Sequence, residues 1–153
     1  MMTLQVVLVE DNPADVKLVR MALQHAGIDC ALFVKEDLET ALAFLEALDA
    51  DPKAIRIDLL LLDVHLPKLD GEGVLKRLRS MEHCAQTPVI VMTASDAAED
   101  HDMAEKHAAI HYFRKPDNLD QFMQLGVIVR DILSRRKPVN NESQGLPQRA
   151  EGA

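Results

Sequence analysis

The sequence predicts one α/β domain built on a parallel β-sheet with helices on both faces. Five apolar runs rich in Val, Ile and Leu are too short to be buried helices. Longer segments with helical period separate them, and this alternation of strand and helix is typical of a parallel sheet. A chain of 153 residues has room for one such domain and is too short for two of ordinary size.

The five predicted strands are the apolar runs themselves. The third contains four consecutive leucines, residues 59–62, without polar alternation, which is expected of a central strand covered on both sides. The second and fifth runs are weaker and favour edge positions. The strands are predicted at residues 4–9, 31–34, 57–62, 89–92 and 110–113.

The intervening segments predict five helices. Asn12 can cap the first helix, Pro13 suits its first turn, and Asp15 complements the positive charge of its N-terminal end. Gly27 can supply the left-handed residue that ends it. The later helices are predicted at residues 38–48, 73–81, 97–107 and 118–136.

The domain is expected to cover residues 1–136, followed by a flexible tail. Residues 137–153 are polar, contain Pro and Gly, and lack periodicity, so they can bury little to offset their ordering entropy. The longest apolar run is far shorter than the roughly 18 to 20 residues that cross a bilayer. Two distant cysteines and the absence of a secretory leader favour a cytoplasmic protein with free thiols.

The charge of the chain limits its partners. With 17 basic and 25 acidic side chains, the formal charge is −8. This charge disfavours a nucleic acid or an anionic membrane as the main partner, and it favours a basic protein surface or a bound cation.

Chemically reactive side chains follow the predicted strands at their carboxyl ends. Glu10 and Asp11 follow the first strand, Asp63 the third and Thr93 the fourth, while Lys115 lies just beyond the fifth. In open parallel sheets, ligands bind outside these ends. Clustered carboxylates repel one another and need a cation or shared protons. Oxygen ligands favour Mg²⁺, with Mn²⁺ as the alternative, over Zn²⁺.

The same edge would suit a transferred phosphoryl group. An ammonium group and a hydroxyl can bind phosphoryl oxygens, which makes the carboxylate between them, Asp63, the candidate acceptor. Taken alone, Asp63 would be interpreted as a cap, and only its companions change that interpretation. Asp70 and Gly71 are attributed to turn chemistry and left out of the site. We interpret three histidines near the fourth helix as a solvated face and not as a metal site: His101, His107 and His111.

Four motifs resemble those of the response-regulator receiver family. They are Val-Glu-Asp-Asn-Pro at 9–13, Leu-Leu-Asp-Val-His-Leu-Pro-Lys-Leu-Asp-Gly at 61–71, Met-Thr-Ala-Ser at 92–95 and Tyr-Phe-Arg-Lys-Pro at 112–116. The resemblance covers about residues 4–136, and Thr93 lies 30 residues after Asp63 and 22 before Lys115. It implies a flavodoxin-like, doubly wound (βα)₅ fold with strand order 2-1-3-4-5.

The resemblance also implies roles for the reactive side chains. Asp63 would accept a phosphoryl group from a sensor histidine kinase. Asp11, Asp63 and the backbone carbonyl of His65 would bind Mg²⁺, with Glu10 acting on the metal directly or through water. Lys115 would contact the phosphate. The peptide bond that follows Lys115 is expected to be cis.

A switch pair is implied as well. Thr93 would move toward the phosphate, and Tyr112 would enter the space that Thr93 leaves, which changes the surface of the fourth helix and fifth strand. Taken alone, Tyr112 would be interpreted as edge-strand packing. The resemblance implies a signalling protein that catalyses at most its own phosphorylation and dephosphorylation.

A narrower resemblance concerns the regulators paired with phytochrome kinases. Three features are similar: the Glu-Asp-Asn-Pro start, the long loop at residues 49–56 and the lack of an output domain. A bacterial phytochrome is therefore one candidate kinase partner. The alternative function is a receiver-fold docking module that is not phosphorylated. A flavodoxin-type FMN protein is disfavoured because the loop after the first strand is acidic. A small-molecule phosphatase is disfavoured because His65 replaces a second acid.

The last predicted helix carries a wide apolar arc. It exceeds the stripe needed to cover one sheet face, which favours a homodimer through this helix or through the fourth helix and fifth strand. A broad packing face of a monomer is the alternative. The arc consists of Leu119, Phe122, Met123, Leu125, Val127, Ile128, Val129, Ile132 and Leu133.

Overall fold

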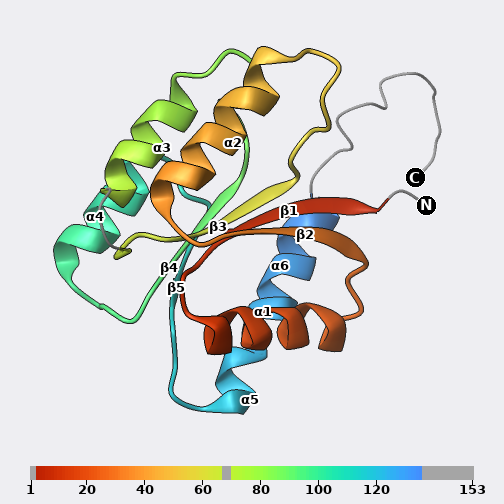
Figure 1. Ribbon diagram of the computed structural model, residues 1–153. Coiled ribbons are helices and arrows are strands. Elements are labelled where there is room, and N and C mark those ends of the chain that lie inside the picture. Colours follow the sequence, from red (N-terminus) through yellow and green to blue (C-terminus); the bar gives the residue numbers. More distant parts are fainter. Residues whose placement is uncertain (1–2, 67–69, 136–153) are drawn as a thin grey trace.

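The computed structural model describes residues 3–66 and 70–135, in which strands and helices alternate (Figure 1). The strands are β1 Leu4–Val9, β2 Cys30–Lys35, β3 Leu59–Asp63, β4 Val89–Thr93 and β5 His111–Arg114. The helices are α1 Pro13–His25, α2 Leu38–Ala50, α3 Gly71–Arg79, α4 Ala98–Lys106, α5 Leu119–Phe122 and α6 Gln124–Arg135. Every predicted strand is present, β1 with the predicted ends and the others with ends that differ by at most two residues. The predicted tail, residues 137–153, lies outside the described ranges.

The five strands form one parallel sheet in the order β2-β1-β3-β4-β5. This confirms the flavodoxin-like fold and the predicted strand order. Val9 pairs with Leu62, Asp63 with Met92, and Thr93 with Arg114. The register therefore brings the carboxyl ends of β1, β3, β4 and β5 to one edge of the sheet, which we call the carboxyl edge.

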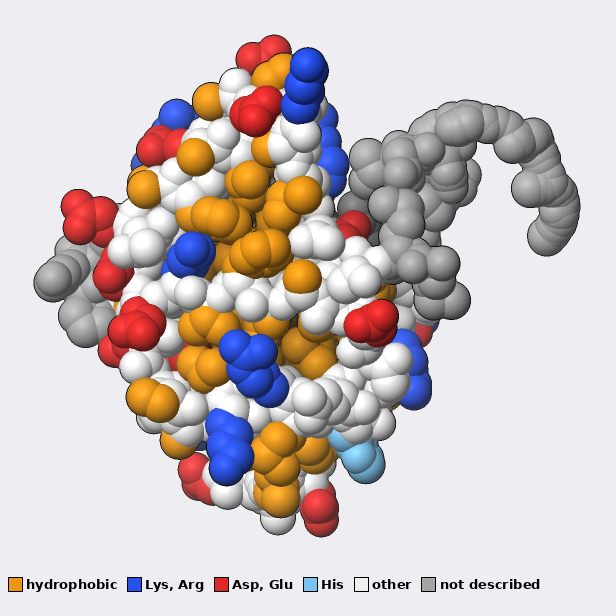
Figure 2. All heavy atoms as spheres, turned by 45° about the vertical axis from the view of Figure 1, so that its right-hand side comes forward, with side chains coloured by type: hydrophobic (Ala, Val, Ile, Leu, Met, Phe, Trp, Pro, Cys, Tyr) orange, Lys and Arg blue, Asp and Glu red, His pale blue; other side chains and the backbone are white. Residues whose placement is uncertain are grey.

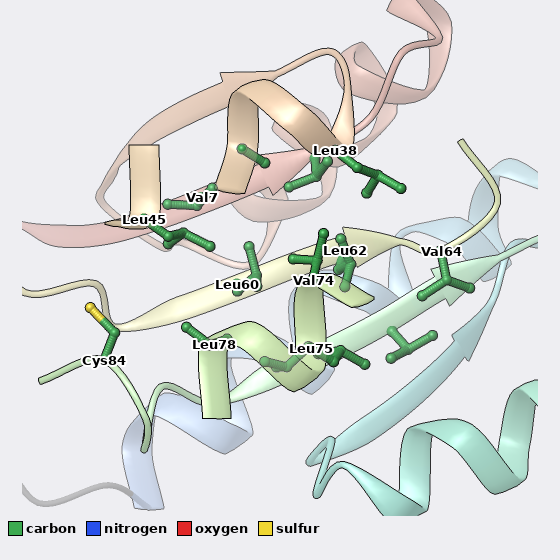
Figure 3. Packing of buried hydrophobic residues seen from close by; sticks show 14 of the residues in the cluster. Val7, Leu38, Leu45, Leu60, Leu62, Val64, Val74, Leu75, Leu78 and Cys84 are labelled. Atoms are coloured by element: carbon green, nitrogen blue, oxygen red, sulfur yellow. The ribbon is translucent and has the colours of Figure 1, made fainter. Parts of the chain in front are cut away.

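Side chains alternate between two cores, one on each face of the sheet. Leu60 and Leu62 of β3 pack with α2 and α3 (Figure 3), whereas Leu59 and Leu61 pack with α1, α5 and α6. All four are fully buried, as expected of a central strand. Burying a Leu side chain stabilises a fold by about 1.5 to 3 kcal/mol, so β3 fixes the position of Asp63 at its end.

Local signals set the ends of the helices. The Asn12 side chain accepts a hydrogen bond from the Ala14 amide, Pro13 is the first helical residue, and Gly27 follows α1 with a φ of 75°. Asp70 caps α3 by accepting from the Glu72 amide at 3.0 Å. Asn12, Pro13 and Gly27 match the predictions from the sequence. Asp70 was attributed to turn chemistry instead, and α3 starts two residues earlier than the predicted residue 73.

The predicted last helix is present but is interrupted at one residue. Met123 separates α5 from α6 while keeping right-handed helical dihedral angles (φ −63°, ψ −19°), and the Gly126 amide donates to the Met123 carbonyl at 3.1 Å. Helix α6 then packs against α1 so closely that a Cβ at Gly126 would collide with the Ala22 carbonyl oxygen. The apolar period continues across the interruption, so the pattern gave no sign of it. Within residues 3–66 and 70–135, no helix is long and apolar enough to cross a bilayer.

Candidate functional site

The ammonium group of Lys115 joins three carboxylates at the carboxyl edge. Lys115 Nζ lies 2.6 Å from Glu10 Oε1, 2.8 Å from Asp63 Oδ2 and 3.0 Å from Asp15 Oδ2. Glu10 follows β1, Asp63 ends β3, and Asp15 lies in the first turn of α1. Lys115 directly follows β5, and its amide donates to the Thr93 carbonyl at 2.8 Å. The sheet thus brings together charges that are up to 105 positions apart.

Burial and pairing set the protonation of this cluster. The Lys115 side chain is 11% exposed and that of Glu10 only 1%. Burial raises the pKa of Glu10, and the bond from Lys115 opposes this effect. Burial lowers the pKa of Lys115, but its hydrogen bonds to Asp63 and Glu10 outweigh burial and raise the pKa above its usual range. Lys115 is therefore charged, and it supplies the cation that the clustered carboxylates require.

Asp63 is held at both oxygens. Oδ1 accepts a hydrogen bond from the His65 amide at 2.9 Å, while Oδ2 accepts from Lys115. The residue is 7% exposed. The loop that follows it passes against α3, where a Cβ at Gly71 would lie 2.7 Å from Val64 Cα. Gly71 is therefore required by a close approach of the backbone, and not by the backbone freedom of a turn.

The structure places the predicted metal ligands Glu10 and Asp63 around the ammonium group of Lys115, where Asp15 is the third carboxylate, and Asp11 is exposed. Among the described residues, no three His, Cys, Asp or Glu side chains are placed to hold a metal ion. The ligand atoms that Glu10 and Asp63 offer are nevertheless carboxylate oxygens. This donor chemistry fits a hard cation such as Mg²⁺ or Mn²⁺.

Thr93 and Tyr112 both contact Ser95. The buried Thr93 hydroxyl accepts from the Ser95 amide at 3.1 Å, and the Tyr112 hydroxyl donates to the Ser95 carbonyl at 2.7 Å. The Tyr112 ring stacks on His101 of α4 with ring centroids 3.7 Å apart. Burial, with the nearby charges of Asp100 and Asp96, raises the pKa of Tyr112. The predicted switch residues therefore meet at one loop, next to α4.

Two residues near the site were missed from the sequence. Asp15 was assigned only to the helix end, and Asp100 was not considered. Asp100 is 8% exposed, and its Oδ2 lies 2.7 Å from His65 Nε2. Burial raises the pKa of Asp100, but hydrogen bonds from His65 and Ser95 outweigh it and hold this pKa below its usual value. The sequence does contain a signal that could have identified these two residues. Both acids lie in the first turn of a helix that starts at the carboxyl edge.

The interpretation of the three histidines is partly wrong. His101 and His111 are exposed. The His107 side chain, however, is only 10% exposed, and its Nε2 lies 2.9 Å from Glu72 Oε2. It joins the end of α4 to α3 and is not part of a solvated face.

The expectation of a cis bond after Lys115 is also wrong. In the described part of the chain every peptide bond is trans, including the one between Lys115 and Pro116. The two isomers of a bond before proline differ by only about 0.5 to 1 kcal/mol, so the dipeptide alone does not decide between them.

Comparison with known proteins agrees with this arrangement. A model of the response regulator receiver domain matches residues 6–125, well over half of the chain. The chain belongs to the response regulator receiver family. Receiver domains are signalling proteins of two-component systems, and they bind divalent metals.

Two similar response regulators are Rcp1 and RcpA, and Rcp1 is matched both by its sequence and by a structure with bound Mn²⁺. Response regulator Rcp1 from Synechocystis sp. is 37% identical over 95 residues, which are 62% of this chain and 65% of Rcp1. The phosphorylated cyanobacterial phytochrome response regulator RcpA has a TM-score of 0.77 at 30% identity, over 88% of this chain and 96% of that chain. The Mn²⁺-bound form of Rcp1 has a TM-score of 0.75 at 32% identity, over 87% of this chain and 96% of that chain. The chain spans 42% to 65% of the length of the first curated relatives it matches.

Proposed function

We propose that this receiver accepts a phosphoryl group on Asp63 from a phosphohistidine of a sensor histidine kinase. The observation that carries the proposal is the contact of Lys115 Nζ with Asp63 Oδ2, at 2.8 Å, in a buried cluster at the carboxyl edge. A carboxylate oxygen of Asp63 forms the bond to phosphorus as the bond to the histidine nitrogen breaks. The histidine nitrogen keeps the electron pair of that bond.

The neighbours of Asp63 have distinct tasks in this proposal. Lys115 moves its ammonium group from the Asp63 carboxylate to a phosphoryl oxygen, and Thr93 donates its hydroxyl to another. Asp11, Asp63 and the His65 carbonyl would hold Mg²⁺, with Mn²⁺ as the alternative, and Glu10 would support the ion directly or through water. A bound ion would neutralise charge on the phosphoryl oxygens.

Phosphorylation would then change the surface near α4 and β5. Thr93 releases the Ser95 amide when its hydroxyl turns to the phosphate, and Tyr112 changes position at the same loop. The partner we propose is a sensor histidine kinase, with a bacterial phytochrome as one candidate, since RcpA is a phytochrome response regulator. We further propose that residues 1–136 form the receiver domain, that it acts without a nucleic-acid partner, and that the chain is a homodimer.

Incubation of the full chain with acetyl phosphate and Mg²⁺ tests the proposal. Intact mass spectrometry should show one added phosphoryl group on the wild type and none on Asp63→Asn. Asp131→Asn is the matched control, because Asp131 is an exposed acid of α6 that pairs with Arg135. A wild type that gains no phosphoryl group from acetyl phosphate or from a histidine kinase would favour the alternative of a docking module.

A further inference from the structure

Within residues 3–66 and 70–135, strand β2 lies at an edge of the sheet and has one neighbouring strand, β1. Its register places Leu4 beside Cys30 and Val9 beside Lys35. The carbonyls of Asp29 and Lys35 accept hydrogen bonds from the amides of Leu4 and Glu10. Because alternate residues of a strand direct their backbone groups to opposite sides, the odd-numbered residues bond to β1. The amides and carbonyls of Cys30, Leu32 and Val34 therefore point to the open edge.

The side chains of β2 are apolar on both faces of this edge. All six residues are half-buried. Cys30, Leu32 and Val34 contact the core beside α1, while Phe33 packs on Phe44 of α2 with ring centroids 5.5 Å apart. Figure 2 shows, on the face that it views, two areas of hydrophobic side chains separated by a pale band, with Lys or Arg side chains among them.

The edge lacks the features that usually prevent strands from pairing. Natural edge strands carry Pro, a bulge or central charges. Between Asp29 and Lys35, the sequence Cys-Ala-Leu-Phe-Val contains none of these. Lys35 lies at the strand end, where its Nζ lies over the Phe44 ring at 4.2 Å. The middle of β2 is thus open to another strand.

We propose that β2 pairs with β2 of a second copy of this chain, antiparallel, about a twofold axis at Leu32. This register places Cys30 opposite Val34 of the second copy, so the residues whose backbone groups point outward face one another. It also places Asp29 opposite Lys35 of the second copy, twice in the dimer. A shift by one pairing step would instead set Asp29 against Phe33 or Lys35 against Ala31. A second copy of β2 therefore fits this edge, because its backbone groups complement those of the first copy and its Asp29 and Lys35 complement the opposite charges.

The proposed surface differs from the last helix. Most of the predicted apolar arc packs within the monomer. Four of its nine residues are buried in the core, and three more are partly buried against it: Phe122, Leu125, Val129 and Ile132, and then Met123, Ile128 and Leu133. Leu119 and Val127 remain 51% and 41% exposed, one on α5 and one on α6. Pairing at β2 also leaves the carboxyl edge accessible, and it does not depend on phosphorylation of Asp63.

Charge reversal tests the pairing through its ion pairs. Sedimentation of the full chain should show a concentration-dependent dimer, and Asp29→Lys should weaken it at least tenfold. Lys35→Asp should weaken it similarly, whereas the double variant should restore it. Circular dichroism checks the fold of each variant. A monomer at all concentrations, or no rescue by the double variant, would overturn the proposal. So would Val127→Asp weakening the dimer as strongly as Asp29→Lys.

A cross-link tests the register separately. In Val34→Cys, the new thiol should lie opposite Cys30 of the second copy, at a spacing that a disulfide can bridge. Oxidised glutathione should then convert the variant to covalent dimers containing the bond between positions 30 and 34. Val127→Cys is the matched control. It should run as a monomer in denaturing, non-reducing electrophoresis. Dimers of the control but not of Val34→Cys, or dimers linked through other positions, would contradict the register.

Discussion

His65 joins Asp63, at the end of β3, to Asp100 of helix α4 through one hydrogen bond to each residue. Its amide donates to Asp63 Oδ1 at 2.9 Å, and its Nε2 lies 2.7 Å from Asp100 Oδ2. The Asp100 side chain is 12% exposed, whereas the His65 ring is 54% exposed. A single residue thus contacts the candidate acceptor with its backbone and α4 with its side chain.

Removing the His65 ring should loosen the start of α4. In His65→Ala, Asp100 loses a partner while it stays largely buried, which should cost about 1 to 3 kcal/mol of unfolding free energy. Hydrogen exchange of the amides at 99–102 should accelerate. Arg135→Ala is the control, because it removes an exposed ion pair with Asp131 that is worth about 0 to 1 kcal/mol. Unchanged exchange at α4 in His65→Ala would show that this bond does not hold the helix.

Lys115 should be the most important charge for stability. Lys115→Met leaves Glu10, Asp15 and Asp63 without their shared cation, and breaking a buried ion pair costs about 3 to 5 kcal/mol. Urea denaturation near neutral pH measures this loss. Lys106→Met provides the comparison, since the Lys106 side chain is 71% exposed and lies 3.9 Å from Glu72, so its loss should cost at most about 1 kcal/mol. Equal effects of the two substitutions would contradict the proposed charge balance.

Two neighbouring glycines of α3 should respond in opposite directions. Gly71→Ala places a Cβ against the Val64 backbone, and such overpacking costs about 1 to 3 kcal/mol. Nothing lies within 4 Å of a Cβ at Gly73, so Gly73→Ala should stabilise the helix by about 0.5 to 1 kcal/mol. Chemical denaturation of both variants measures the contrast. Stabilisation by Gly71→Ala would show that the loop after Asp63 is not held against α3.

The contact between Glu72 and His107 should make stability depend on pH in the acid range. The hydrogen bond from His107 holds the pKa of Glu72 below its usual value of 4.5. A carboxyl with a lowered folded-state pKa stabilises the fold above its unfolded pKa, and this contribution is lost as the pH falls through the folded value. Glu72→Gln should therefore flatten the fall in melting temperature below pH 4.5. His107→Gln should flatten it too, and an unchanged slope in both variants would exclude the pair.

The sequence predicted the sheet because each strand has its own apolar run. Residues 59–62 are apolar at every position and are fully buried. The one-residue interruption at Met123 escaped prediction because hydrophobic periodicity is the same on both sides of it. The close packing of Gly126 in α6 against Ala22 in α1 also has no local signature, because the two residues are far apart in the sequence.

The candidate site was predicted only in part, because the sequence does not show in which direction each side chain points. Glu10 and Asp11 are adjacent in sequence, yet Glu10 is 1% exposed and Asp11 is exposed, because successive residues at a strand end point in different directions. The sequence alone could not show which acid turns toward Lys115. The contact of His65 with Asp100 spans 35 positions and has no local signature.

The site of phosphorylation is the most direct test of the proposed function. After incubation with acetyl phosphate and Mg²⁺, borohydride should reduce an acyl phosphate to an alcohol, which converts the phosphorylated Asp into homoserine. Peptide mass spectrometry then locates the converted residue. The proposal predicts homoserine at position 63 and nowhere else. Conversion at Asp11, Asp15 or another carboxylate, with Asp63 unchanged, would contradict it.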